Sequence, residues 1–110
     1  MNTAMIGDFE HVFTAIKQHP TVRVVILIAK GKFFLSGLDV KEFSSTFRPD
    51  QSDAARKAIF IEEQLKRVQR AVLSVYECRV PVIVGVHSLC SGGGLDFITA
   101  TDIRYCTKKA

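Results

Sequence analysis

The chain has 110 residues, of which 47% are hydrophobic and 24% are charged, and its formal net charge is +4. This length suits one small domain, and the hydrophobic share excludes an intrinsically disordered chain. The basic residues are spread along the sequence and form no Lys/Arg-rich run with interleaved aromatics, which argues against a nucleic-acid partner.

Cysteine usage and the length of the apolar runs exclude further classes. The three cysteines, Cys78, Cys90 and Cys106, are odd in number and form no C-x-x-C pair. We therefore expect reduced thiols and neither a disulfide framework nor a metal site. No apolar run approaches the roughly 20 residues that a membrane span needs, and the N-terminal residues lack the pattern of a secretory signal.

The first predicted element is an amphipathic helix over residues 3–18. Apolar residues recur there at spacings of three and four, as they do on one face of a helix: Ile6, Phe9, Phe13 and Ile16. Asn2 or Thr3 can cap its start, Gly7 lies in its interior, and His19-Pro20 ends it.

Residues 22–29, V-R-V-V-I-L-I-A, are β-branched and almost wholly apolar. This pattern predicts a strand buried on both faces, as in parallel sheets covered by helices. After a turn at Gly31 and Lys32, the chain runs from apolar residues through Gly37 to a polar stretch, and residues 48–53 are predicted to form a loop.

The second half repeats the alternation of helix and strand. The sequence predicts a long helix over residues 53–77, a buried strand over 80–87, a triglycine turn, a short helix over about 93–100 and a third strand over 102–107. This order favours an α/β fold with a mainly parallel sheet.

Two glycine turns follow two of the predicted strands, at residues 36–39 (S-G-L-D) and residues 91–94 (S-G-G-G). In parallel sheets, ligands bind beyond the carboxyl ends of the strands. Glycine allows a tight bend and lets a ligand approach the backbone N–H groups closely. An anion-binding role and a simple tight turn both remain open. The P-loop, the dinucleotide fingerprint and the nucleophile elbow are excluded, because none of their spacings occurs.

Several polar residues near these turns have a structural and a catalytic reading. Asp96 can complement the helix dipole, or act as an acid if it is buried and faces a second acid or base. Asp39 is expected to bond local backbone, and Asp102 to pair with a neighbour such as Arg104. His87 and Cys90 are more simply packing residues than a base and a nucleophile. Ser36 and Ser91 are expected to be turn formers.

In their order and separation, the two turns resemble the crotonase superfamily, the enoyl-CoA hydratase/isomerase family. Residues 22–43 are similar to the family stretch in which a buried strand leads to a Phe-x-x-Gly-x-Asp turn. Residues 79–107 resemble the stretch with a proline, a strand, a Gly-Gly-Gly turn and a Cys/Thr-Asp-Ile strand. The resemblance implies a partial crotonase fold, a superhelix of ββα units.

The resemblance also implies roles for particular residues. The backbone N–H groups of Leu38 and Gly93 would form the oxyanion hole for a thioester carbonyl, and Asp96 falls at the first catalytic carboxylate. Contacts to the acyl-CoA substrate would come from Ser36, Gly37, Leu38, Asp39, Val40 and Gly93. An aspartate at position 96 followed by D-I-R-Y-C-T is similar to the Δ3,5-Δ2,4-dienoyl-CoA isomerase branch, in which paired acids shuttle a proton.

For the parent protein, this branch implies an isomerase of fatty-acid β-oxidation, mitochondrial or peroxisomal, assembled as a homotrimer or hexamer. Coenzyme A would be part of the substrate, with no further cofactor. The family's N-terminal strands, second catalytic Glu and C-terminal half have no counterpart in residues 1–110, so we expect one partial domain. Two alternatives remain: an enoyl-CoA hydratase on the same fold, and a catalytically incomplete fragment without enzyme activity.

Overall fold

The structure is a computed structural model that describes residues 1–46 and 53–110. Except for Asp53, the predicted loop over residues 48–53 lies outside the described residues. The elements follow in the order α1 (Thr3–Gln18), β1 (Val25–Ile28), α2 (Val40–Thr46), α3 (Ala54–Tyr76), β2 (Val82–Val86), α4 (Gly93–Thr99) and β3 (Ile103–Cys106). The predicted alternation of helices and strands is confirmed, and α2 is an addition to it.

The three strands form one parallel sheet in the order β1-β2-β3. Val25 of β1 lies beside Val82 of β2, and Ile83 of β2 lies beside Ile103 of β3. Parallel neighbours need crossover connections, which α2 and α3 provide between β1 and β2, and α4 provides between β2 and β3. The predicted parallel α/β arrangement is therefore confirmed.

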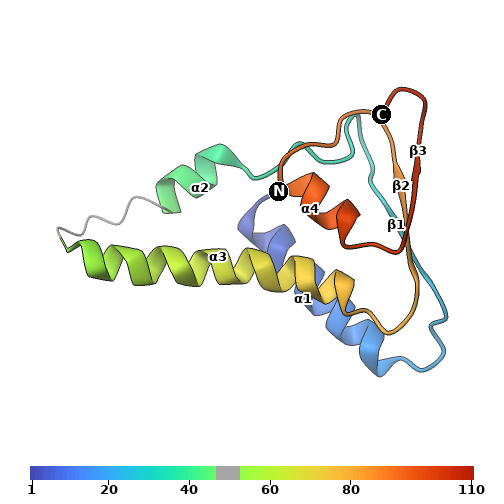
Figure 1. Ribbon diagram of the computed structural model, residues 1–110, viewed down its shortest axis with the longest axis horizontal. Coiled ribbons are helices and arrows are strands. Elements are labelled where there is room, and N and C mark those ends of the chain that lie inside the picture. The colour runs from blue at the N-terminus through green and yellow to red at the C-terminus, as the bar shows by residue number, and fades with distance from the viewer. Residues whose placement is uncertain (47–52) are drawn as a thin grey trace.

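The helices lie on one side of the sheet, where they build the core (Figure 1). Alternate residues of β2 point toward them, and Val82 and Val84 are fully buried. Val82 packs in one cluster with Ile6 and Phe13 of α1, Ala71 and Val75 of α3 and Phe97 of α4. The Phe97 ring lies 4.3 Å from the Phe9 ring, centroid to centroid, which joins α4 to α1.

The opposite face of the sheet is apolar but exposed. Ile26 and Ile28 of β1 are 66% and 68% exposed, and Tyr105 of β3 is 66% exposed. The prediction that the first strand is buried on both faces is thus wrong for this chain. Its run of apolar residues has the right composition, but the described residues supply helices for one face only.

Side-chain caps account for the start of each longer helix. The Asn2 side chain accepts a hydrogen bond of 2.9 Å from the Met5 N–H at the start of α1. Of the two predicted caps, Asn2 and Thr3, it is therefore Asn2 that caps the helix. Asp53 accepts one of 3.0 Å from the Ala55 N–H at the start of α3. Such caps satisfy N–H groups that have no partner within the helix. None of the described helices is long and apolar enough to cross a membrane.

The short helix α2 was not predicted, although the sequence carries a signal for it. Asp39 accepts hydrogen bonds of 3.0 and 3.1 Å from the N–H groups of Lys41 and Glu42. This confirms that Asp39 bonds local backbone, and the bonded groups are the first turn of a helix. An acid three residues before a glutamate is typical of a helix start, and Asp39 and Glu42 have this spacing.

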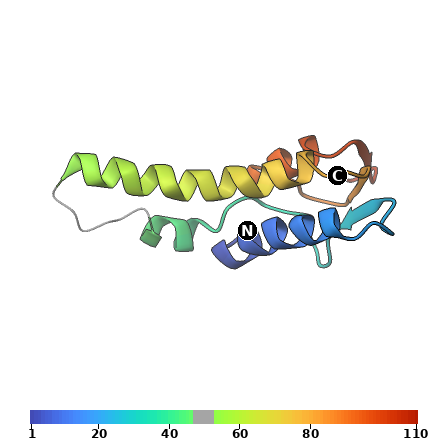
Figure 2. The same ribbon diagram turned by 90° about the horizontal axis from the view of Figure 1, so that it is seen from below.

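The molecule is flat and elongated, with extents of 49 × 35 × 18 Å. Its radius of gyration of 15.7 Å exceeds the roughly 13 Å of a compact domain of 100 residues. Figure 2 shows why: the long helix α3 runs beside α1 at one end and extends past it at the other, with α2 beneath. Part of α3 therefore projects beyond the core.

Two residues of the last segment anchor α4 and β3, but they do not pair with each other. The Asp102 carboxylate accepts a hydrogen bond of 2.8 Å from the Val82 N–H. The Arg104 guanidinium donates to the carbonyl groups of Ile98 (3.3 Å) and Thr101 at the end of α4. The expected Asp102–Arg104 pair is thus wrong, because backbone groups left over at the strand edge and the helix end engage both side chains.

We predict that Asp102→Ala destabilises the protein by about 1.5–3 kcal/mol, because it leaves the buried Val82 N–H without its charged acceptor. Urea unfolding measures the loss. Asp102→Asn, which keeps an acceptor oxygen, should lose less. Asp8→Ala, at an exposed acid on α1, is the matched control and should change stability little. Equal midpoints for Asp102→Ala and Asp8→Ala would contradict the anchoring role.

We further predict that Gly94→Ala destabilises the start of α4. A Cβ at this position would lie 2.8 Å from the Leu35 carbonyl oxygen and 3.0 Å from the Cys90 sulfur, and relieving such overpacking costs about 1–3 kcal/mol. At Gly7, inside α1, a Cβ would meet nothing within 4 Å. Gly7→Ala should therefore stabilise the protein by about 0.5–1 kcal/mol. Thermal unfolding of both variants tests the contrast, and a shift of the same sign in both would refute it.

Candidate functional site

The two glycine turns are joined just beyond the carboxyl ends of β1 and β2. Leu35 and Cys90 form a parallel bridge outside the named strands. The Ser91 N–H donates to the Leu35 carbonyl at 2.9 Å, and the Leu35 N–H donates to the Leu89 carbonyl at 3.2 Å. These bonds extend the pairing of β1 and β2 past the ends of the strands, so the two turns lie next to each other at one edge of the sheet.

At this place the turns touch backbone to backbone. A Cβ on Gly37 would lie 3.6 Å from the Gly93 nitrogen and 3.4 Å from the Ser91 carbonyl oxygen. A Cβ on Gly92 would lie 3.4 Å from the Gly37 Cα. Gly37 and Gly92 also have positive φ angles of 95° and 53°, which side chains disfavour. Glycine is therefore required at both positions for conformation, and its small size allows the contact.

The two predicted oxyanion donors, Leu38 and Gly93, flank this contact. Gly93 is the first residue of α4, where backbone N–H groups have no partner within the helix. Leu38 follows Gly37, and its side chain lies 3.9 Å from the position of a Cβ on Gly93. Among the described residues, no acceptor receives either N–H. Both donors are therefore free to bind an oxygen.

The turn at residues 36–39 is held from both sides. On the C-terminal side of the turn, the Asp39 side chain caps the start of α2. The Asp39 N–H donates to the Met1 carbonyl at 2.7 Å, which ties the turn to the residues just before α1. Ser36 and Val40, the outer members of the predicted substrate-binding set, are exposed. The Asp39 carboxylate is engaged with backbone, so its direct contribution is to fix the turn.

Asp96 lies on α4, one turn after Gly93, and its side chain is exposed. It lines an open cavity with Thr99 and with residues of α3: Val68, Gln69, Val72 and Leu73. None of these other lining residues is acidic. The described residues thus place one carboxylate beside a largely apolar surface, and the second acid that a proton shuttle needs is not among the cavity's lining residues.

The apolar wall of this cavity was only partly visible in the sequence. Val68 and Val72 are apolar residues of the long helix that the sequence predicts, and both also pack, partly buried, against the core cluster. No sequence motif points to Gln69, Leu73 or Thr99, because their place beside Asp96 follows from the packing of α4 near α3.

His87 and Cys90 have the packing roles that the sequence suggested. The His87 Nε2 atom lies 2.9 Å from the Gly31 carbonyl oxygen, and its ring meets the Phe34 ring edge to face. Cys90 packs against the cluster of Phe34, Val84 and Val86. Burial raises the pKa of the Cys90 thiol, which disfavours the thiolate that a nucleophile would need. All three cysteines are free.

Comparison with known proteins identifies the family of the chain. The family model described as enoyl-CoA hydratase/isomerase matches residues 1–110. A peroxisomal Delta(3,5)-Delta(2,4)-dienoyl-CoA isomerase of Arabidopsis thaliana is 39% identical over 105 residues, which are 94% of this chain and 38% of that protein. A mitochondrial protein of the same name from Mus musculus is 35% identical over the whole chain and 34% of its own length.

Solved structures agree with the family model. The crystal structure of an enoyl-CoA hydratase/carnithine racemase from Magnetospirillum magneticum has a TM-score of 0.83 and 28% sequence identity, covering 99% of this chain and 38% of that one. The chain thus spans little more than a third of the relatives that it matches. It belongs to the enoyl-CoA hydratase/isomerase family and has part of the crotonase fold.

Proposed function

We propose that the protein carrying this chain moves the double bonds of a 3,5-dienoyl-CoA to the 2,4 positions. The observation that carries the proposal is the pair of unengaged N–H groups, on Leu38 and Gly93, at the contact between the two glycine turns. The named activity of the Arabidopsis and mouse relatives supports the same reaction.

The backbone donors would stabilise charge that develops on the substrate. When a proton leaves the carbon beside a thioester carbonyl, negative charge moves onto the carbonyl oxygen. Fixed N–H groups that point at this oxygen lower the barrier, and one such donor is worth about 2.7–4 kcal/mol. Backbone hydrogen bonds hold both turns, so the Leu38 and Gly93 N–H groups would act from fixed positions.

Asp96 would be one of two proton-transfer acids. Converting a 3,5-diene to a 2,4-diene removes a proton from C2 and adds one to C6, with no net change in atoms or electrons. Two groups at separate points along the acyl chain suit this task. The apolar surface of Val68, Val72 and Leu73 beside Asp96 would hold the acyl chain, and the family resemblance implies a glutamate as the second acid.

The remaining features of the proposal follow from the same relatives. Because the reaction only relocates protons, it needs no cofactor beyond the coenzyme A of the substrate. The relatives are named as peroxisomal and mitochondrial, and we propose one of these compartments for the parent protein. We also propose that it assembles as a homotrimer or hexamer, as the family resemblance implies.

Hydration of a 2-enoyl-CoA is the second candidate, favoured by the solved relative from Magnetospirillum magneticum that is named a hydratase. Supplying each substrate to the full-length protein separates the two. An isomerase returns a 2,4-dienoyl-CoA of unchanged mass, whereas a hydratase adds one water. A third possibility is that residues 1–110 alone lack activity, which a comparison of this segment with the full-length protein would reveal.

We predict that Asp96→Asn in the full-length protein lowers kcat for a 3,5-dienoyl-CoA by about 10²–10⁴-fold, because general acid–base catalysis contributes this much. KM should change little, since the amide has nearly the same shape. Diene absorbance measures the rate. Asp8→Asn removes the same charge from exposed α1 and should leave the rate unaltered. Equal rates for wild type and Asp96→Asn would exclude proton transfer by Asp96.

A further inference from the structure

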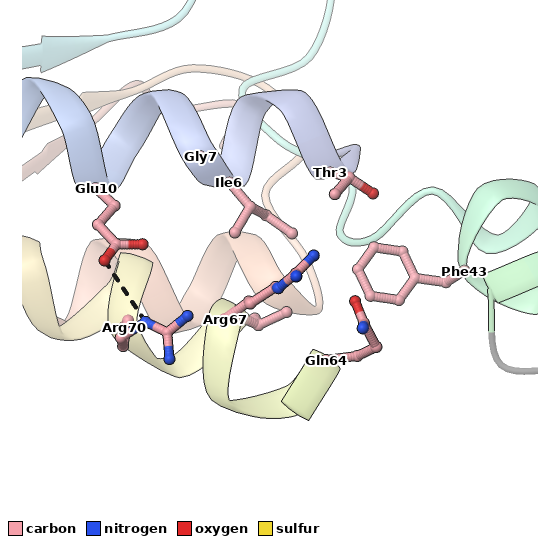
Figure 3. A pocket seen from close by; sticks show the side chains of 9 residues that line it. Thr3, Ile6, Gly7, Glu10, Phe43, Gln64, Arg67 and Arg70 are labelled. Atoms are coloured by element: carbon pink, nitrogen blue, oxygen red, sulfur yellow. Dashed lines mark ion pairs between the residues drawn. The ribbon is translucent and has the colours of Figure 1, made fainter. Parts of the chain in front are cut away.

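A second pocket, of about 250 Å³, lies between α1, α2 and α3 (Figure 3). Neither the two glycine turns nor Asp96 lines it, although Val68 of α3 borders both this pocket and the cavity beside Asp96. Its walls include Ile6 and Gly7 of α1, Phe43 of α2, and Gln64, Arg67 and Val68 of α3. The Thr3 N–H donates to the Glu42 carboxylate at 3.1 Å, which ties α1 to α2 at this pocket. Its volume is below the roughly 300–1,000 Å³ of drug-sized sites, so it suits a small ligand.

Arg67, an exposed residue of α3, brings a positive charge to the wall of this pocket. Figure 3 shows its side chain reaching across the pocket toward the Phe43 ring. Within the described part of the chain, no hydrogen bond or ion pair engages its guanidinium group. A guanidinium presents a planar fork of donors that matches a carboxylate with two parallel hydrogen bonds.

The neighbouring charges favour a ligand with a single negative charge. Arg70 also lines the pocket, but its Nε lies 3.5 Å from a carboxylate oxygen of Glu10. Among the residues that line the pocket, this ion pair balances one positive and one negative charge, which leaves the charge of Arg67. The Glu42 carboxylate, at the edge of the pocket, accepts the Thr3 N–H. A monoanion would match it, whereas a phosphate dianion would keep excess charge beside the Glu10 carboxylate.

The other walls favour an apolar body behind that charge. Ile6, Phe43 and Val68 contribute aliphatic and aromatic surface. Gly7 leaves space on the α1 wall, where a Cβ would meet no heavy atom within 4 Å. A glycine inside a helix costs about 0.5–1 kcal/mol relative to alanine, and neither packing nor a positive φ explains this one. Open space for a ligand would explain it.

From these contacts we propose that the pocket between α1, α2 and α3 binds a small monocarboxylate with an apolar body. The carboxylate receives hydrogen bonds from the Arg67 guanidinium, with the Gln64 amide as a further donor. The carbon skeleton lies against Phe43, Ile6 and Val68, in the space beside Gly7. Apart from Val68, this site shares no lining residue with the cavity beside Asp96, and it does not depend on the proposed isomerase activity.

Equilibrium dialysis of the full-length protein with labelled hexanoate tests the proposal. Arg67→Gln should weaken hexanoate binding by about 10- to 100-fold, the equivalent of one or two charge-assisted hydrogen bonds. Arg67→Lys keeps the charge without the fork and should lie between. Lys57→Gln removes a positive charge about 15 Å away on the same helix and should bind as the wild type does.

A second variant separates binding from folding. Gly7→Leu retains every charge and improves helix propensity, but it places a side chain on the pocket wall and should also block hexanoate. Its thermal unfolding should show an intact fold. Wild-type affinity in both Arg67→Gln and Gly7→Leu would overturn the proposal. Tighter binding of inorganic phosphate or of 1-hexanol than of hexanoate would overturn the ligand class.

Discussion

The backbone contact between Gly37 and the Gly92–Gly93 turn is the constraint on which this structure depends. Two parallel strands end at the same edge of a sheet, but they do not by themselves bring the following loops into contact. Here the Leu35–Cys90 bridge continues their pairing, and three glycines allow the backbones to approach within van der Waals distance. Larger residues at these positions would separate the N–H groups of Leu38 and Gly93.

The two halves of the contact are anchored by different means. The turn at residues 36–39 is fixed by the Asp39 cap on α2 and by the bond to Met1. The turn at residues 91–94 is fixed through α4, whose Phe97 is buried in the core and whose end is held by Arg104. The anchors come from separate elements, and the contact between the two turns joins them.

Periodicity and turn chemistry allowed the sequence to predict most of the fold. The helix over residues 3–18 has the predicted bounds, and α3 is within a residue of its predicted ends. The parallel sheet and the position of Gly93 at a helix start also followed from pattern alone. These features are local, or they follow from the handedness and connection rules that govern βαβ units.

Other features depend on tertiary contacts that a pattern cannot supply. The apolar run of β1 predicted burial on both faces, yet Ile26 and Ile28 are exposed, because burial depends on what the rest of the chain places there. Asp102 was expected to pair with Arg104, but its carboxylate accepts the Val82 N–H instead. The ion pair was suggested by the closeness of the two residues in the sequence. In the structure, the Val82 N–H at the strand edge is placed to donate to the Asp102 carboxylate.

The two parts of the proposed catalytic site differ in how much of each the described residues contain. An oxyanion hole made of backbone N–H groups requires only two turns at one sheet edge, and residues 35–38 and 89–94 contain both. A proton shuttle requires two carboxylates at separate points along a substrate, which a single sheet edge does not provide. Asp96 therefore stands exposed beside an apolar surface. Its proposed role requires a further element of the full-length protein to cover this surface and supply the second acid.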